Sequence, residues 1–470
     1  MPNEVSGPNP PRHAVTRSGR VTPLIAAPRW RYALIIGLYA YQGVIAGFAL
    51  TALPNHFSAL GATTEAIGAY VAAIGLPWVL QPLWGPVVDR FGGFRMGRRR
   101  FWVVMALVAA WLALLRLTLE DAVTLASMAT IGGVMMLHSV FASLIDTATD
   151  GLIIDQVPNE RLGTANAATR IGFVGGISVG AALFAWLLEA HGVFVAALLL
   201  LVLGAATLTL ALLVREGPGD ARVSLRYRRE QESGVSLGVV FRKLASNLWR
   251  PDALALLILC FCFNFAAAAF RVPLAVELIQ QRGWSPAALS TFQAGTFLIT
   301  GTAGALLVGW WTDRVGPAKA LTVLLGLCGA AHVAAALLLL VPDLRWMSVA
   351  GPLALGVSAT LPTLVFVALA PTVMQASRGT AAASQFALFM AALNLGDVAG
   401  AGLAGALAGG LGLWGVGMAA ATVFAASALL AARAGYWRGP SAMPGTGDRF
   451  GRVVTTPGSV ARVSPQVPTA

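Results

Sequence analysis

Apolar runs of roughly 20 residues recur along most of this chain, and short polar loops separate them. A run of this length crosses a hydrocarbon core about 30 Å thick when it folds as a helix. Charged residues make up only 11% of the sequence and hydrophobic residues 57%, whereas a soluble domain carries about 25% charged residues. The pattern therefore predicts an all-α polytopic membrane protein.

The apolar runs form two sets of six predicted spans, with boundaries good to a few residues. The first set covers about 32–54, 65–88, 100–119, 122–152, 161–189 and 192–214, and the second about 252–280, 286–311, 318–341, 346–374, 380–408 and 411–435. Polar, disordered tails are expected at 1–31 and 436–470. We therefore expect two six-helix bundles, at 32–214 and 252–435, joined by a cytoplasmic linker at 215–251.

The net charge of +12 is distributed unevenly along the chain. Most Lys and Arg residues lie in the tails and in alternate loops, which is the positive-inside pattern and predicts that both termini are cytoplasmic. No nucleic-acid partner is expected, because such a protein gathers its basic residues on one folded soluble face. The basic segment 215–250 has two interpretations: it binds anionic membrane lipid, or it serves only as a linker.

An eight-residue motif occurs twice, each time after the second span of a set. Its copies are GPVVDRFG, from Gly85 to Gly92, and GWWTDRVG, from Gly309 to Gly316. We expect the first glycine to permit close helix packing, the aspartate to cap the turn, and the arginine to pair with that aspartate. The expected gating residues are Gly85, Asp89 and Arg90 in the first copy and Gly309, Asp313 and Arg314 in the second. The motif resembles the loop signature of the major facilitator superfamily, which implies the major facilitator fold of two six-helix repeats.

The stretch from about residue 35 to 190 resembles the AmpG-like branch of that superfamily, the muropeptide permeases and their relatives. The residues that carry this resemblance are Pro82, Leu83, Trp84, Pro86, Gly97, Arg98, Arg99, Arg100, Trp102, Asp146, Asp150, Asp155, Pro158, Arg161, Gly163, Arg170, Gly172, Gly175 and Gly176. Two positions depart from the branch, since Gln81 stands where a lysine is expected and Ile145 where a glutamine is expected. The resemblance therefore implies the branch but leaves the substrate open.

Three charges stand within the fourth and fifth predicted spans, where a charge at the helix centre costs roughly 2.5–3.5 kcal/mol. Asp146 and Asp150 are four residues apart, so their carboxylates share one helix face and repel each other. Arg170 is expected at a similar depth on the next helix, where it can neutralise one carboxylate and leave the other free to take a proton. The three are candidates for proton coupling or anion binding; the alternative is a structural ion-pair network.

Other polar residues inside apolar spans are candidates for the lining of a cavity. In the second half, Arg271 and Asp397 are candidate coupling residues because they are intramembrane charges; the alternative is a structural pair of Arg271 with Asp397 or Glu277. Pro273 is expected to break the seventh span. The uncharged candidates are Tyr39, Tyr41, Gln42, Gln81, Asn264 and Gln293.

No GxxxxGK[ST], HExxH, GxSxG or clustered Cys/His pattern occurs in the sequence, so an ATP-driven pump in one chain, an enzyme and a bound metal or cofactor are not expected. Together with the resemblance, the residues predict a monomeric, multi-pass permease of a bacterial-type inner membrane. It is expected to import an organic small-molecule solute, muropeptide-like or siderophore-like, with the proton gradient. Two alternatives stay open: an exporter of amphipathic compounds, and a non-transporting assembly or sensing protein of the same fold.

Overall fold

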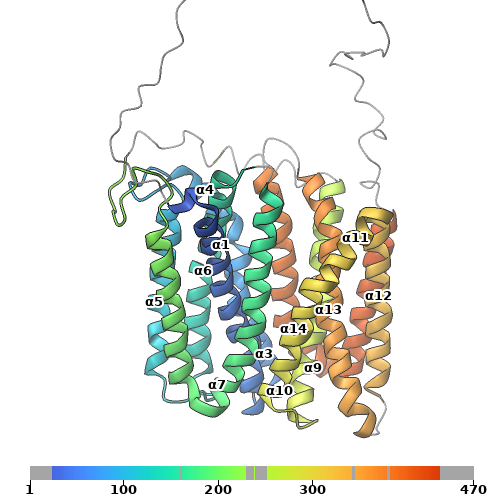
Figure 1. Cartoon of the computed structure of the whole chain (residues 1–470). Helices are drawn as coiled ribbons and strands as arrows, with labels where there is room; N and C mark the ends of the chain where they lie inside the picture. Colours follow the sequence, from blue (N-terminus) through green and yellow to red (C-terminus); the bar gives the residue numbers. More distant parts are fainter. Residues whose placement is uncertain are drawn as a thin grey trace, which may run out of the picture. The chain divides into compact units, whose positions relative to one another are not determined.

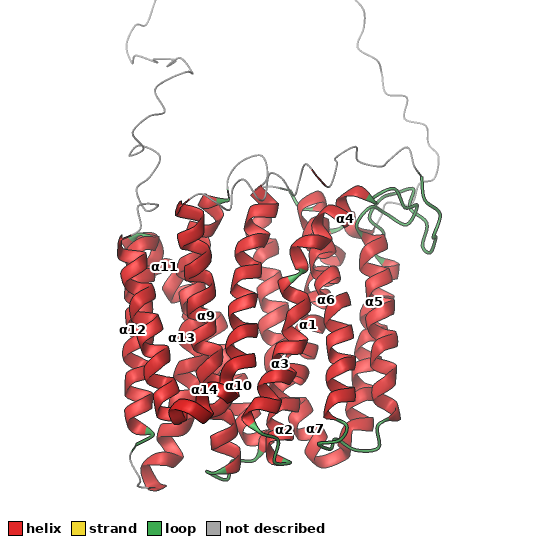
Figure 2. Cartoon of the chain, turned by 180° about the vertical axis from the view of Figure 1, so that it is seen from behind, coloured by secondary structure: helices red, strands yellow, loops and turns green. Residues whose placement is uncertain are grey.

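The computed structural model describes residues 24–158, 161–228, 238, 251–340, 344–377 and 382–433. These residues are almost entirely helical, and the helices run side by side along roughly one direction (Figure 1, Figure 2). This part of the chain contains ten helical spans long and apolar enough to cross a membrane, which confirms the all-α polytopic architecture. The tails predicted at either end, up to residue 23 and from residue 434, lie outside the described residues, as does most of the linker beyond residue 228.

The helices fall into an N-terminal half, up to residue 228, and a C-terminal half, from residue 251. The N-terminal half contains α1 (Pro28–Gly47), α2 (Leu53–Ala59), α3 (Thr64–Val79), α4 (Trp84–Arg90), α5 (Arg100–Leu115), α6 (Met128–Gln156) and α7 (Leu162–Leu213). The C-terminal half contains α9 (Pro251–Gln280), α10 (Pro286–Ile299), α11 (Ala305–Val315), α12 (Pro317–Leu338), α13 (Leu344–Ala376) and α14 (Ala382–Arg433).

Several predicted spans consist of shorter helical pieces joined end to end. The π-helical turns η2 (Phe48–Ala52) and η7 (Thr300–Gly304) join α1 to α2 and α10 to α11, and the 3-10 turn η3 (Gln81–Leu83) joins α3 to α4. The 3-10 turns η1 (Leu24–Ala26) and η4 (Arg116–Leu119) precede α1 and follow α5. By contrast, α9 continues through Pro273, so the predicted break of the seventh span is wrong. Neighbouring helices and local adjustments satisfy the backbone groups that such a proline frees.

The two longest helices, α7 and α14, each contain one residue with a non-helical backbone. Gly192 has φ 76° and ψ −179°, and Gly412 has φ 68° and ψ 166°. A positive φ strains any residue with a Cβ atom, so glycine is the residue that permits these breaks. Both glycines lie where the sequence places the boundary between the fifth and sixth spans of a half.

Contacts with α1 show that α7 reverses its direction at Gly192. The contacts are Gly172–Ile36 and Gly180–Val44 before the break, and Gly204–Tyr41 and Leu210–Gly37 after it. The chain direction of α7 is therefore parallel to that of α1 before Gly192 and antiparallel to it afterwards. This one helical element thus supplies two antiparallel segments, each long enough to be a span.

The same kind of close contact joins the first and fifth spans of both halves. A Cβ atom on Gly176 would collide with the carbonyl oxygen of Ala40, and one on Gly400 would collide with the carbonyl oxygen of Phe265. Backbones approach so closely only where a side chain is absent. The contact of α7 with α1 is equivalent to that of α14 with α9, and this supports the duplication inferred from the sequence.

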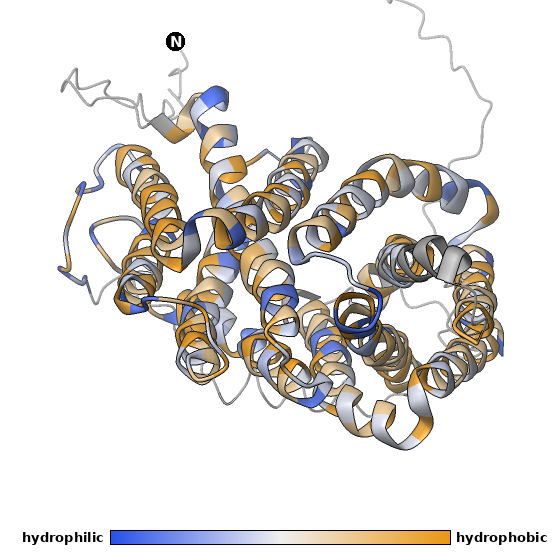
Figure 3. Ribbon diagram, turned by 90° about the horizontal axis from the view of Figure 1, so that it is seen from below, coloured by the Kyte–Doolittle hydropathy of each residue, from blue (hydrophilic) through white to orange (hydrophobic). Residues whose placement is uncertain are grey.

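Apolar side chains cover much of the outside of the helices. On α11, for example, Leu306 and Leu307 are 76% and 68% exposed. Seen along the helices, the ribbon is predominantly hydrophobic and its hydrophilic residues form short stretches (Figure 3). A soluble monomer rarely exposes such a surface, whereas lipid tails cover it without cost.

We predict that Gly176→Ala lowers the thermal unfolding midpoint of the purified protein in detergent. The added methyl group has to displace the α1 backbone, and overpacking of this kind costs typically about 1–3 kcal/mol. Gly175→Ala is the matched control, because a Cβ atom at Gly175 meets nothing within 4 Å. Equal midpoints for the two variants, measured by scanning fluorimetry, would contradict this account of the contact.

Candidate functional site

The predicted acidic pair lies on one face of α6, and each carboxylate receives a hydrogen bond from an uncharged side chain. Gln81 Nε2 donates to Asp146 Oδ2 over 2.7 Å, and the Tyr39 hydroxyl donates to Asp150 Oδ1 over 2.5 Å. The donors come from η3 and α1, so the pair ties three elements of the N-terminal half together. One turn before Asp146, Ser143 accepts a hydrogen bond from Trp84 Nε1 over 2.9 Å.

Arg170 does not form the predicted contact with the acidic pair. Among the described residues it makes no ion pair with Asp146 or Asp150; its guanidinium lies over the ring of Phe366 on α13, 5.3 Å from the ring centre. The Asp150 and Arg170 side chains are exposed and that of Asp146 is half-buried. The site therefore has two carboxylates with neutral partners, and Arg170 lies near enough to interact with both electrostatically.

Two predicted cavity residues on α1 are buried instead. Tyr41 packs inside the N-terminal half, with its hydroxyl 3.3 Å from Nε2 of the buried His138. Gln42 is also buried, and its amide has no hydrogen-bond partner among the described residues. The sequence could not show this, because adjacent positions on a helix differ by about 100° in direction. Tyr39 and Gln81 are the uncharged candidates that reach the acidic pair.

The C-terminal half contains the predicted ion pair. Arg271 on α9 and Asp397 on α14 approach to 3.0 Å, whereas Glu277 pairs with Arg282 at 3.1 Å. Asn264 donates to the Leu393 carbonyl oxygen over 3.2 Å and so also joins α9 to α14. Of the two pairings considered for Arg271, the structure therefore contains the one with Asp397.

The first gating motif lies at the end of the helices where α7 leads into residues 214–228, which we call the linker end. Asp89 contacts Arg99 at 2.6 Å and Arg98 at 3.4 Å, and Arg99 also contacts Asp155 at 2.9 Å. Burial alone would lower the pKa of the Arg99 guanidinium. The negative charges of Asp89 and Asp155 together have the larger effect and raise this pKa. Arg99 therefore joins the motif residue Asp89 to Asp155 on α6.

The motif glycines do not make the predicted close contacts in this structure. A Cβ atom on Gly85 would meet nothing within 4 Å, and one on Gly309 would meet only Val367, at 4.0 Å. In the second copy, Arg314 lies over the ring of Trp310, 3.5 Å from the ring centre, and Asp313 is exposed. Neither motif glycine is therefore packed closely against another helix at the linker end.

At the opposite end, which we call the far end, hydrogen bonds cross between the two halves. Asn55 donates to Ser290 and to Gln293, both over 2.8 Å. Gln280 donates to the carbonyl oxygens of Ser58 and Ala62 over 2.9 and 2.8 Å. Gln293, predicted to line a cavity, therefore belongs to a contact that closes the far end.

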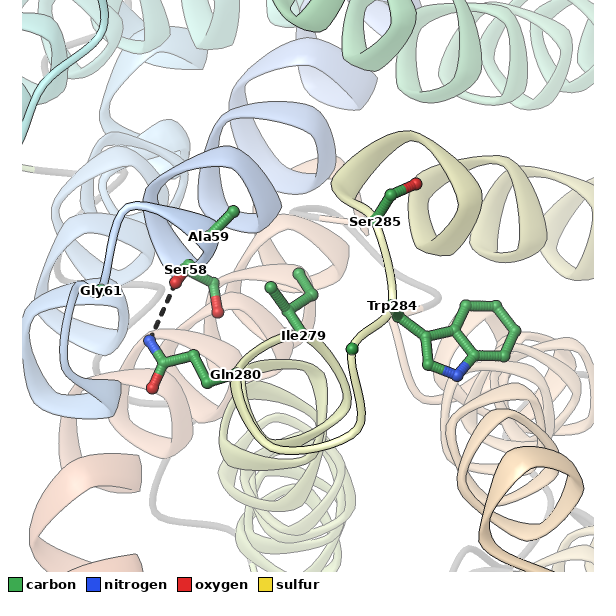
Figure 4. Close-up of a pocket in the computed structure, with 8 residues that line it drawn as sticks. Ser58, Ala59, Gly61, Ile279, Gln280, Trp284 and Ser285 are labelled. Atoms are coloured by element: carbon green, nitrogen blue, oxygen red, sulfur yellow. Dashed lines mark hydrogen bonds between the residues drawn. The ribbon is translucent and has the colours of Figure 1, made fainter. Parts of the chain in front are cut away.

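A pocket of about 530 Å³ opens beside this closure (Figure 4). Its walls are the end of the first span, including Ser58 and Gly61, and the turn from α9 to α10, including Trp284. In Figure 4 Gln280 points toward Ser58 and bonds to it, while Trp284 points away from that bond. The pocket is separate from the acidic pair and lies on the outer side of the closure.

Sequence reasoning missed Asn55 and Gln280 at the far end and the role of Arg99. Asn55 in ALPNHF and Gln280 in ELIQQRG are polar residues at the ends of apolar runs, which is the signal that could have identified them. For Arg99 the signal was the run of three arginines after Gly97. Among the described residues, no group of three His, Cys, Asp or Glu residues is placed to hold a metal ion.

The sequence matches the family model described as Major Facilitator Superfamily over residues 33–385. It is 33% identical over 129 residues to an uncharacterized protein of Haemophilus influenzae, which covers 26% of this chain and 30% of that protein. It is 26% identical over 170 residues to a folate-biopterin transporter of Synechocystis sp., which covers 35% of this chain and 31% of that protein. The chain therefore spans about a third of the length of these relatives.

Solved structures of transporters have a similar fold. A POT family transporter in complex with 5-aminolevulinic acid superposes with a TM-score of 0.62 and 12% identity, over 85% of this chain and 95% of that one. The nucleoside transporter NupG gives a TM-score of 0.62 and 14% identity, over 85% of this chain and 98% of that one. At these identities the likeness is one of fold alone.

We predict that Asn55→Ala loosens the far end. A cysteine in place of Ala294, which is buried one turn along α10 from Ser290, should then react several-fold faster with a membrane-impermeant maleimide added at the far end. The reason is that the substitution removes two hydrogen bonds between the halves. Asn264→Ala is the matched control, because it removes a hydrogen bond within one half. Unchanged labelling in Asn55→Ala would show that these bonds do not hold the halves together.

Proposed function

Because the chain belongs to the Major Facilitator Superfamily, we propose that Asp146 and Asp150 couple the entry of protons to the uptake of an organic solute. The family itself makes the protein a multi-pass secondary transporter of a small solute and not an enzyme. The proposal adds the coupling ion, the direction and the residues that carry the coupling.

One observation carries the proposal: within the described part of the chain, the two carboxylates are held by Gln81 and Tyr39 and not by a cation. A glutamine amide and a tyrosine hydroxyl can each donate a hydrogen bond to a carboxylate or accept one from a carboxylic acid. The site can therefore gain or lose a proton without leaving a charged partner behind. Arg170 is the group that can approach when the proton leaves, since its present partner is the ring of Phe366.

The contacts between the halves support a state that is open toward the linker end. Hydrogen bonds of Asn55 and Gln280 close the far end, while Asp150 and Arg170 remain exposed. In transport by alternating access, one half rocks against the other around a site between them. We infer that the far end opens when the linker end closes, and that the motifs at Asp89 and Asp313 help to hold the closed linker end.

The topology and location complete the proposal. Since α7 and α14 each break at a glycine, the ten spans correspond to twelve crossings. We propose that both termini and the linker are cytoplasmic, which the charge distribution supports, and that the protein is a monomer in the inner membrane of a bacterial-type cell. The AmpG-like branch stays a proposal that rests on motif residues such as Pro82, Trp84 and Arg99.

The substrate class follows from the chemistry around the acidic pair. Carboxylates beside an aromatic ring and an arginine suit a solute that carries several hydrogen-bond donors and an acidic or flat part. Muropeptides and siderophores have such groups. Pterins have them as well, and one relative that matches part of this chain is a folate-biopterin transporter.

We predict that one solute from these classes acidifies the lumen of proteoliposomes that contain the wild type, and that Asp150→Asn abolishes this acidification. The assay follows a pH dye inside the vesicles while anhydro-muropeptides, ferric siderophores, folate or biopterin are added outside. Loss of the carboxyl removes the proton site but leaves the Tyr39 hydroxyl a side-chain oxygen to bond, so the fold should persist.

Glu120→Gln is the control for loss of a carboxylate, because Glu120 pairs with Arg116 near the far end, away from the acidic pair. It should acidify the lumen as the wild type does. Solute uptake by the wild type without a pH change would refute proton coupling, and unchanged acidification in Asp150→Asn would refute the role of that residue. Movement of loaded solute outward against its gradient would favour the exporter.

A further inference from the structure

The beginning of the predicted linker is folded against the loop that follows the first gating motif. Residues 214–228 pair with residues 93–95: the Arg95 N–H donates to the Arg226 carbonyl oxygen, and the Ala221 and Arg228 N–H groups donate to the Arg95 and Gly93 carbonyl oxygens. These bonds measure between 2.8 and 3.1 Å. We call residues 214–228 the hook.

Buried polar contacts fix the base of the hook to α5 and α7. The buried Arg100 donates to five carbonyl oxygens, which belong to Met96, Ala211, Leu212, Ala221 and Arg222. Glu216 accepts from the N–H groups of Arg99 and Arg100 over 2.9 and 3.1 Å and so caps the start of α5. Burial raises the pKa of the Glu216 carboxyl, and these two N–H groups oppose the rise.

Aromatic rings hold the tip of the loop against the hook. Phe94 stacks on Phe101, with ring centres 3.4 Å apart, and meets Tyr227 edge to face at 4.9 Å. Trp102 also packs edge to face against Phe101 at 5.5 Å. The hook is therefore a defined structural element, although the sequence alone predicts only a linker there.

The outer face of the hook combines aliphatic and basic side chains that contact little of the protein. Val223 and Leu225 are 72% and 68% exposed. Exposed arginines surround them: Arg95, Arg222, Arg226 and Arg228. In Figures 1 and 2 the segment projects sideways from the linker end of α5 and α7, beyond the outline of the helices.

We propose that the hook binds the anionic phospholipid headgroups of the bilayer that surrounds α5 and α7. The exposed side chain of Leu213, at the end of α7, makes the apolar surface of that helix continuous with the hook. At that level a bilayer offers phosphate groups to arginines and the outer part of the acyl chains to Val223 and Leu225. The rigid base means that binding does not have to order the backbone first.

The sideways position favours lipid over a soluble partner. A segment that projects past the helices at their linker end meets the membrane interface before it meets the aqueous phase. Arginine suits this place because its stem packs on apolar surface while its guanidinium contacts phosphate. Lipid composition should therefore change the environment of the hook even when no solute is transported.

The test uses the full-length protein in nanodiscs of phosphatidylcholine alone or with phosphatidylglycerol. Cys260, Cys262 and Cys328 are replaced by alanine, and Leu225→Cys carries an environment-sensitive fluorophore. With phosphatidylglycerol we expect a blue shift of the emission and a several-fold fall in quenching by iodide. At 1 M salt, where the Debye length is about 3 Å, much of this difference should disappear.

Two comparisons decide the outcome. A label at Gly219→Cys, on the same segment but further from the cluster of Arg222, Arg226 and Arg228 in the sequence, should show a smaller difference between lipids; a Cβ atom there meets nothing within 4 Å. Combining Arg222→Gln, Arg226→Gln and Arg228→Gln should abolish the difference at position 225, and these exposed changes leave Arg100 intact. Equal quenching in both lipid compositions would overturn the proposal. The proposal would also be overturned if the label in detergent without lipid were protected from iodide as well as it is with phosphatidylglycerol, because the label would then be covered by protein.

Discussion

The cost of a charge inside the membrane determines how the interior of this protein is arranged. A charge at the centre of a membrane helix costs roughly 2.5–3.5 kcal/mol, so a partner from another element has to meet it. Asp146 is met by η3, Asp150 by α1, and Asp397 by α9. Each of these contacts also joins two helical elements. It fixes how one lies along the other, which apolar packing alone does not specify. The glycine contacts of α7 with α1 and of α14 with α9 then set how closely those helices pack.

The two halves share this scaffold but differ in how a proton would affect them. In the C-terminal half, protonation of Asp397 would leave Arg271 without its charged partner, and breaking a partly buried ion pair in this way is costly. In the N-terminal half, protonation of Asp146 or Asp150 leaves behind only an amide or a hydroxyl, which can reverse its hydrogen bond. Protons should therefore act first on the N-terminal half, while the ion pair keeps α9 and α14 together.

Composition and hydropathy were sufficient to predict an all-α polytopic membrane protein and to identify three carboxylates within its helices, because both follow from local sequence. Side-chain partners were harder to predict, since a change of one residue in helix rotation turns a side chain by about 100°. This rotation places Arg170 over Phe366 and brings Tyr39 to Asp150. The contact of Asp89 with Arg99 was missed because it depends on the path of the loop after α4. That path is set by the hook, which lies more than a hundred positions further along the chain.

Different interactions stabilise the two ends of the helices, and this difference bears on how the halves can move. The ion pairs of Asp89, Arg99 and Asp155 at the linker end stay within the N-terminal half, so they do not oppose separation of the halves there. At the far end the halves are joined by four neutral hydrogen bonds, two from Asn55 and two from Gln280, and by one from the Ala287 N–H to the carboxylate of Glu189. A neutral hydrogen bond contributes about 0.5–1.5 kcal/mol net and one to a charged group about 1.5–3 kcal/mol, so these bonds together amount to several kcal/mol. One bound solute or one proton can supply that much, which is the condition for a transporter to pass between two states without being trapped in either.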